Sequence, residues 1–160
     1  MDKMPLKGII DEDFVNYKVP SMTLMFPYCS FKCVIGEAQC QNSMIALEKT
    51  ILVDIDSLCK RYVDNPISEA IVLQGLEPMD SFRDVLNLLD VLRNKYHCKD
   101  DAVIYTGYDE YEIKDKVDKL KKYRNVVMKF GRYLPNQEPH FDKVLGIKLA
   151  SDNQYAERIS

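Results

Sequence analysis

The sequence predicts an α/β fold with a mostly parallel sheet. Four short apolar runs, several of them rich in β-branched residues, alternate with three stretches that have helical periodicity. Such runs are typical of strands that are buried on both faces of a sheet. Strands that alternate with helices indicate right-handed βαβ units, in which neighbouring strands are parallel.

The first strand is expected at Ser21–Phe26, where an apolar run is bounded by Pro20 and Pro27. The next expected element is a helix with Asp54 or Asp56 as its N-cap. The dipeptide Asn65-Pro66 should end it. The expected apolar face of this helix consists of Ile55, Cys59 and Val63.

A second strand is expected at Ala70–Leu73, a fully apolar run. Asp80 or Ser81 should then cap an amphipathic helix. Its apolar side consists of Phe82, Val85, Leu86, Leu88, Leu89, Val91 and Leu92.

The last part of the pattern repeats this alternation. A strand is expected at Ala102–Tyr105, followed by a helix from Asp109 through Tyr123. A further strand is expected at Asn125–Phe130, and Gly131 should end it. The order of these elements completes the predicted parallel sheet.

Composition indicates one globular domain of 160 residues, with 46% hydrophobic and 29% charged residues. The formal net charge of -3 gives no reason to expect nucleic acid or an anionic membrane as a partner. There is no apolar run of about 20 residues and no signal-peptide core. An odd number of cysteines, five, argues against a disulfide framework. We therefore expect a cytoplasmic protein in a reducing environment.

Three of the five cysteines lie in one loop after the first expected strand, with the spacing C-x3-C-x6-C: Cys29, Cys33 and Cys40. Thiolates are soft ligands that suit zinc, copper(I) and iron–sulfur clusters. A closed structural site normally recruits four protein ligands, so three thiolates leave one coordination position open. We interpret the loop as the site of a [4Fe–4S] cluster with one iron available to a small chelating cofactor.

Two other interpretations of the cysteines compete with a cluster. Cysteines are often small buried apolar side chains, but three within twelve positions around Lys32, Glu37 and Gln39 do not resemble a core. Zinc is the stronger alternative, with His97 or Cys98 as a fourth ligand. Those two residues precede a strand, which should place them at the opposite edge of the sheet. The sequence therefore favours the cluster over zinc.

Two more loops follow expected strands, Gln74–Pro78 and Thr106–Tyr108. Parallel sheets bind ligands at the carboxyl ends of their strands, so both loops should meet the cysteine loop at one edge. There the Glu77 carboxylate could hold an amino group by a charge-assisted hydrogen bond. The alternative interpretation of Gln74–Pro78 is a tight turn with a solvated glutamate. The alternative interpretation of Thr106–Tyr108 is a strand end whose glycine has an unusual backbone angle.

Together these landmarks resemble the small radical S-adenosylmethionine (SAM) activating enzymes, most closely the anaerobic ribonucleotide reductase activating proteins. The landmarks are the cysteine loop, Gly75-Leu76-Glu77-Pro78, Tyr105-Thr106-Gly107-Tyr108 and, near the C-terminus, Ser151-Asp152-Asn153-Gln154. The gap between Cys33 and Cys40 is four residues longer than in that family, Gln39 replaces an aromatic residue, and Leu76 replaces a glycine.

The resemblance implies a partial (β/α) barrel of the small radical SAM type, formed by one domain over residues 1–160. An entry segment of about residues 1–19 would precede it, and a C-terminal extension would span about residues 132–160. Cys29, Cys33 and Cys40 would each ligate one iron and would be the catalytic residues. The SAM-binding residues would be Gly75, Glu77, Tyr105 and Thr106.

The implied activity is reductive cleavage of SAM to a 5′-deoxyadenosyl radical, which the cofactors supply and the protein orients. The implied partners are a glycyl-radical enzyme, such as an anaerobic ribonucleotide reductase, and an electron donor such as flavodoxin or ferredoxin. Such chemistry favours low oxygen. Two other functions stay open: a small radical SAM enzyme that modifies a nucleotide or peptide, and a non-catalytic zinc or iron–sulfur interaction module.

Overall fold

A six-stranded sheet forms the centre of the protein in a computed structural model, which describes residues 2–29 and 48–160. The strand order is β10-β7-β6-β5-β3-β2. The bounds are β2 Gly8–Asp13, β3 Ser21–Phe26, β5 Ala70–Gly75, β6 Asp101–Tyr105, β7 Val126–Phe130 and β10 Tyr155–Arg158. The inner four strands are parallel, and β2 and β10 pair antiparallel at the two edges.

The predicted α/β class and the mostly parallel sheet are therefore confirmed. All four predicted strands are present, each within a few residues of its expected bounds. The six strands form an open sheet whose outermost strands are β2 and β10. The partial barrel that the resemblance implied stays a prediction.

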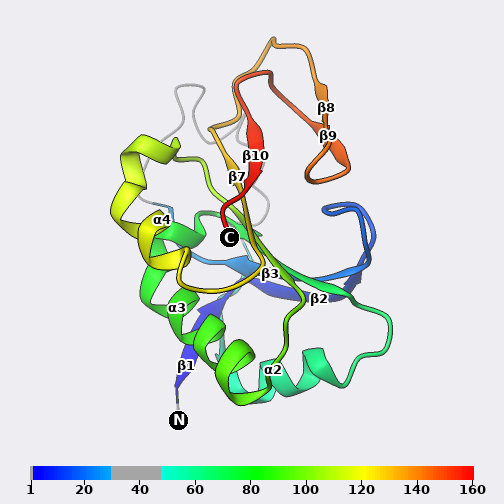
Figure 1. The fold of residues 1–160 in the computed structure, drawn as a ribbon, viewed down its shortest axis with the longest axis vertical. Coiled ribbons are helices and arrows are strands. Elements are labelled where there is room, and N and C mark those ends of the chain that lie inside the picture. The colour runs from blue at the N-terminus through cyan, green and yellow to red at the C-terminus, as the bar shows by residue number, and fades with distance from the viewer. Residues whose placement is uncertain (1, 30–47) are drawn as a thin grey trace.

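In the described part of the chain, three helices cover one face of the sheet (Figure 1). They are α2 Ile55–Val63, α3 Phe82–Asp90 and α4 Lys114–Leu120. Short turns extend two of them: the 3-10 turns η2 Pro78–Ser81 and η4 Glu110–Ile113 precede α3 and α4, and the π turn η3 Val91–Lys95 follows α3. The main hydrophobic core lies between these helices and the sheet, since their buried side chains share one cluster with alternate residues of the strands.

Local capping chemistry explains where the helices begin. Asp54 is the N-cap of α2, because its carboxylate accepts the Ser57 N–H at 2.8 Å. Asp109 forms a capping box with Glu112 at the start of η4. Ser81 makes no side-chain cap, and η2 leads directly into α3 instead.

The expected apolar face of α2 was wrong at one position. Val63 is exposed, and Tyr62 is buried in its place together with Leu58. Tyr62 lies seven residues after Ile55, which is nearly two full turns, whereas Val63 is rotated by roughly a quarter turn from that line. The aromatic ring of Tyr62 therefore completes the buried stripe.

The other face of the sheet has a lighter cover (Figure 1). Residues 14–19 and the hairpin of β8 His140–Asp142 with β9 Ile147–Leu149 pack there. A second, smaller apolar cluster joins these segments to the strands and consists of Tyr17, Ala70, Val72, Val103, Val127, Leu145 and Leu149.

Both terminal segments contribute strands that the sequence did not predict. In the entry segment, β1 Lys3–Leu6 pairs with β4 Ile51–Asp54, and β2 joins the central sheet. In the C-terminal extension, β8 and β9 form the hairpin and β10 completes the sheet. Within the two described ranges, no helix has the length and apolar character needed to cross a membrane.

Candidate functional site

The loop that carries the first cysteine and the turn that carries Glu77 begin in direct contact. Phe26 ends β3 and is the register partner of Gly75, which ends β5. Leu76 donates its backbone N–H to the Phe26 carbonyl at 3.0 Å. Gly75 has a φ of 97°, and a Cβ there would lie 2.4 Å from the Phe26 nitrogen. Only glycine fits this close approach without strain.

Cys29 lies three residues after the end of β3 and is exposed. Cys33 and Cys40 fall outside the described residues, so the convergence of the three sulfurs stays a prediction. A cluster of three or more His, Cys, Asp or Glu side chains that could hold a metal does not occur among the residues that the structure describes. Of the cysteines, that set contains Cys29, Cys59 and Cys98.

Glu77 joins the loops that follow β5 and β6. Its side chain is fully buried. One carboxylate oxygen accepts the Gly107 N–H at 2.8 Å, and the other accepts the Met79 N–H at 3.1 Å. Burial raises the pKa of Glu77, against the hydrogen bonds from Gly107, Thr106 and Met79, which lower it. The expected convergence of these two loops is confirmed.

Tyr105 and Thr106 lie at the end of β6 and make internal hydrogen bonds. The Tyr105 hydroxyl donates to the Asn16 carbonyl at 2.6 Å. The Thr106 hydroxyl accepts the Tyr108 N–H at 3.1 Å. Both side chains therefore stabilise the strand end, and their contact with SAM stays a prediction.

Lys129 is a buried charged residue that the sequence analysis missed. It lies in β7 with 7% of its surface exposed. Its ammonium group donates to the carbonyls of Gly131 at 2.9 Å and Thr106 at 3.4 Å, and it lies 5.7 Å from the centre of the Tyr105 ring. Burial lowers the pKa of Lys129 to about 8, although the Glu77 carboxylate opposes this shift. Lys129 therefore links the loops after β6 and β7, and the only sign of it in the sequence was a charge inside an apolar run.

The C-terminal segment Ser151–Gln154 packs against the residues that follow β7. Gln154 donates its side-chain amide to the Gly131 carbonyl at 3.3 Å and accepts the Ser151 N–H at 3.1 Å. Asn153 donates to the Arg132 carbonyl at 2.8 Å. This landmark of the sequence therefore meets the others at the same edge of the sheet.

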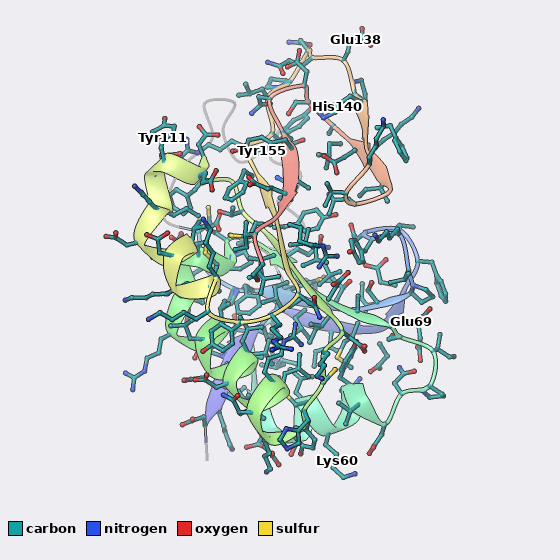
Figure 2. The ribbon with its side chains drawn as sticks, viewed as in Figure 1. Lys60, Glu69, Tyr111, Glu138, His140 and Tyr155 are labelled. Carbon is teal, nitrogen blue, oxygen red and sulfur yellow. The ribbon has the colours of Figure 1, made fainter. Side chains whose placement is uncertain are left out.

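The alternative zinc ligands lie elsewhere. His97 and Cys98 precede β6, whereas Cys29 follows the carboxyl end of the parallel strand β3. The length of a five- or six-residue strand, about 15 Å or more, separates the two edges. Glu69, just before β5, and Tyr111, in the turn η4 after β6, lie on opposite sides of the view in Figure 2. The prediction that His97 and Cys98 lie at the far edge from Cys29 is confirmed.

A family model described as a 4Fe-4S single cluster domain matches residues 20–154, well over half of the chain. The chain belongs to this family. No curated protein matches it significantly. The match begins just before β3 and ends at Gln154, so it includes the cysteine loop, Glu77 and Lys129. Membership in the 4Fe-4S single cluster domain family supports a [4Fe–4S] cluster as the cofactor and an iron–sulfur-dependent function.

The donor chemistry of the chain fits such a cluster. Cys29 is exposed at the start of its loop, where a thiolate can reach a metal without disturbing the core. Cys59, by contrast, is fully buried, and burial raises the pKa of its thiol to about 12. Cys59 is therefore a core residue rather than a ligand.

Proposed function

We propose that this protein is a radical SAM enzyme that cleaves SAM reductively to a 5′-deoxyadenosyl radical. The observation that carries the proposal is the hydrogen bond from Leu76 to Phe26, which joins the base of the cysteine loop to the Glu77 turn. In a protein of the 4Fe-4S single cluster domain family, this places a polar turn beside the start of the ligand loop. The order of the four sequence landmarks gives further support.

Cys29, Cys33 and Cys40 would hold three irons of the cluster and leave the fourth open. When bound and reduced, the cluster supplies the one electron that breaks a carbon–sulfur bond of the SAM sulfonium, with methionine as the second product. The protein contributes the geometry: Gly75 allows two backbones to lie in contact, and the buried Glu77, Thr106 and Lys129 fix the strand ends around the site. A fixed polar surround costs little reorganisation during the reaction.

The proposed substrate is a glycine of a partner glycyl-radical enzyme, such as an anaerobic ribonucleotide reductase. Hydrogen abstraction from the glycine Cα would yield 5′-deoxyadenosine and a glycyl radical on the partner. The electron would come from a flavodoxin- or ferredoxin-type donor. A protein substrate that covers the loops at this edge of the sheet would supply the closed environment that radicals need.

Anaerobic reconstitution tests the cofactor and the reaction together. We expect a brown protein with about four irons per chain, and formation of methionine and 5′-deoxyadenosine when SAM and a reductant are added. Changing Cys29, Cys33 or Cys40 to Ala should abolish SAM cleavage. The matched controls are Cys59→Ala and Cys98→Ala, which should retain it. One tightly bound zinc per chain, or equal losses from all five changes, would contradict the proposal.

A second experiment tests the substrate class. The reconstituted protein, SAM, a reductant and an anaerobic ribonucleotide reductase from the same source should give a glycyl-radical signal in electron paramagnetic resonance. SAM cleavage without that signal, for every glycyl-radical enzyme of the source, would instead favour a small radical SAM enzyme that modifies a nucleotide or peptide.

A further inference from the structure

The Glu77 carboxylate is already occupied in the structure. Each of its two oxygens accepts a backbone N–H, one from Gly107 and one from Met79. The residue has no exposed surface. A group that binds a ligand directly must present a polar atom to it. To do so, the Glu77 carboxylate would have to leave its backbone donors unpaired and lose the energy of those hydrogen bonds.

Glu77 also belongs to a series of hydrogen bonds that joins neighbouring strand ends. Leu76 bonds to Phe26 between the loops after β3 and β5. Glu77 bonds to Gly107 between the loops after β5 and β6. Lys129 then joins the Thr106 and Gly131 carbonyls, and Gln154 bonds to Gly131. The described ends of β3, β5, β6 and β7 are therefore each joined to the next by a hydrogen bond.

We propose that Glu77 is a positioning residue, which holds the turn after β5 to the loop after β6 and does not contact the amino group of bound SAM. This inference rests on the proposed function. It differs from the expectation that the resemblance gave, in which the carboxylate itself held the amino group. The Gly75 backbone is then the predicted contact within the turn.

The substitution Glu77→Gln separates the two roles. A glutamine can accept one of the two backbone N–H groups, but its amide nitrogen cannot accept the other. The connection between the loops is therefore weakened whether or not a cofactor is present. If Glu77 instead contacted the amino group of SAM, the substitution would weaken mainly the binding of ligands that have this amino group.

The first measurement needs no cofactor. Amide hydrogen exchange of the cluster-free protein should show Gly107 or Met79 exchanging at least about fivefold faster in the Glu77→Gln variant, while amides of α3 keep their protection. The matched control is Asp54→Asn, which makes the same carboxylate-to-amide change at the N-cap of α2 and should leave Gly107 unchanged. Unchanged exchange of both amides in Glu77→Gln would overturn the proposed link between the loops.

The second measurement compares two ligands on the cluster-loaded protein, SAM and its analogue in which hydrogen replaces the amino group. We expect Glu77→Gln to weaken the binding of both by the same factor, so that the ratio of the two dissociation constants is unchanged. A loss confined to SAM would overturn the positioning role. If the wild-type protein binds neither ligand, the proposed function fails, and the exchange experiment still decides whether Glu77 holds the loops.

The wild-type protein provides a test that does not depend on a folded variant. With Glu77 as a positioning residue, the Gly107 amide should remain equally protected when SAM or the analogue without the amino group is bound. Loss of protection with SAM alone would mean that the carboxylate turns away from Gly107 to the amino group, which contradicts the proposal.

Discussion

Gly75 shows how one residue type determines the approach of two backbones. The residue combines a positive φ with direct contact to the backbone of Met25 and Phe26. Since the contacted atoms belong to the main chain of a buried strand, they cannot move aside as a flexible side chain could.

We expect Gly75→Ala to lower the free energy of unfolding by at least about 1–3 kcal/mol, because the new Cβ meets the Phe26 nitrogen and the backbone angle disfavours alanine. Urea denaturation checks this. Gly8→Ala is the control, since a Cβ there would meet only the Met25 sulfur at 3.5 Å, which is an ordinary contact. Equal stabilities of the two variants would contradict the explanation.

Because of Lys129, the free energy of unfolding should depend on pH in the alkaline range. Its pKa is about 8 in the folded protein, against an ordinary value of 10.5. Between these values the unfolded chain binds more protons, so the contribution of Lys129 to stability is largest above pH 10.5 and is lost as the pH falls towards 8.

The variant Lys129→Met should remove this dependence. From pH 8 to 9.5, we expect the free energy of unfolding of the wild type to rise relative to the variant by about 1 kcal/mol per pH unit. Urea denaturation at several pH values measures the difference, in which the titration of other groups cancels. A difference that stays constant with pH would show that Lys129 titrates normally.

Among the elements, a half-buried polar contact joins the amino end of β6 to two other parts of the chain. The Asp101 carboxylate accepts the Tyr17 hydroxyl at 2.6 Å and forms a bidentate pair with Arg158 at 2.9 Å for both bonds. Asp101 therefore links β6, the edge strand β10 and the segment that follows β2.

Tyr17→Phe should lower the free energy of unfolding by about 1.5–3 kcal/mol, because a half-buried carboxylate loses one of its donors. Tyr123→Phe is a matched control, since the Tyr123 hydroxyl donates to Asp90 at the protein surface. We expect Tyr123→Phe to lower the free energy of unfolding by clearly less than Tyr17→Phe does, as measured by chemical denaturation. A larger loss for Tyr123→Phe would mean that burial does not determine the strength of these bonds.

The sequence predicted those elements whose side chains are uniformly buried. The strands β3, β5, β6 and β7 are nearly continuous apolar runs, because both faces of a parallel sheet are covered. The strand β10 could not be predicted in this way, since most of its side chains are exposed and two are charged. Its position is determined by its pairing with β7 and by the contact of Arg158 with Asp101. Neither of these long-range contacts can be read from a local sequence pattern.

At the scale of the whole molecule, topology predicted that the loops would meet, but not which atoms would bond. The parallel order of β5 and β6 was sufficient to bring Glu77 near Gly107. The acceptance of two backbone N–H groups by Glu77 depends on the path of both loops. Lys129 likewise shares its Gly131 acceptor with Gln154 of the C-terminal segment. Such contacts are properties of the assembled fold, because their partners are distant in the sequence.

The C-terminal extension is therefore part of the structure rather than an addition to it. Deleting residues 153–160 removes β10, which leaves the edge of β7 unpaired and takes the Arg158 guanidinium away from the Asp101 carboxylate. We expect the shortened protein to lose soluble yield and to form larger species in size-exclusion chromatography. Glu157→Ala, an exposed change within β10, should behave as the wild type does. A monomeric shortened protein with an unchanged melting temperature would contradict this role.

The hairpin of β8 and β9 has one more effect on the sheet. Asp142, at the end of β8, accepts the Ala156 N–H at 3.0 Å and the Leu145 N–H at 2.9 Å. In the antiparallel pair with β7, the Ala156 amide points away from β7, towards the side where a strand of another molecule would add. The Asp142 carboxylate already accepts from that donor, so the Ala156 amide is not available to pair with a strand added at this border.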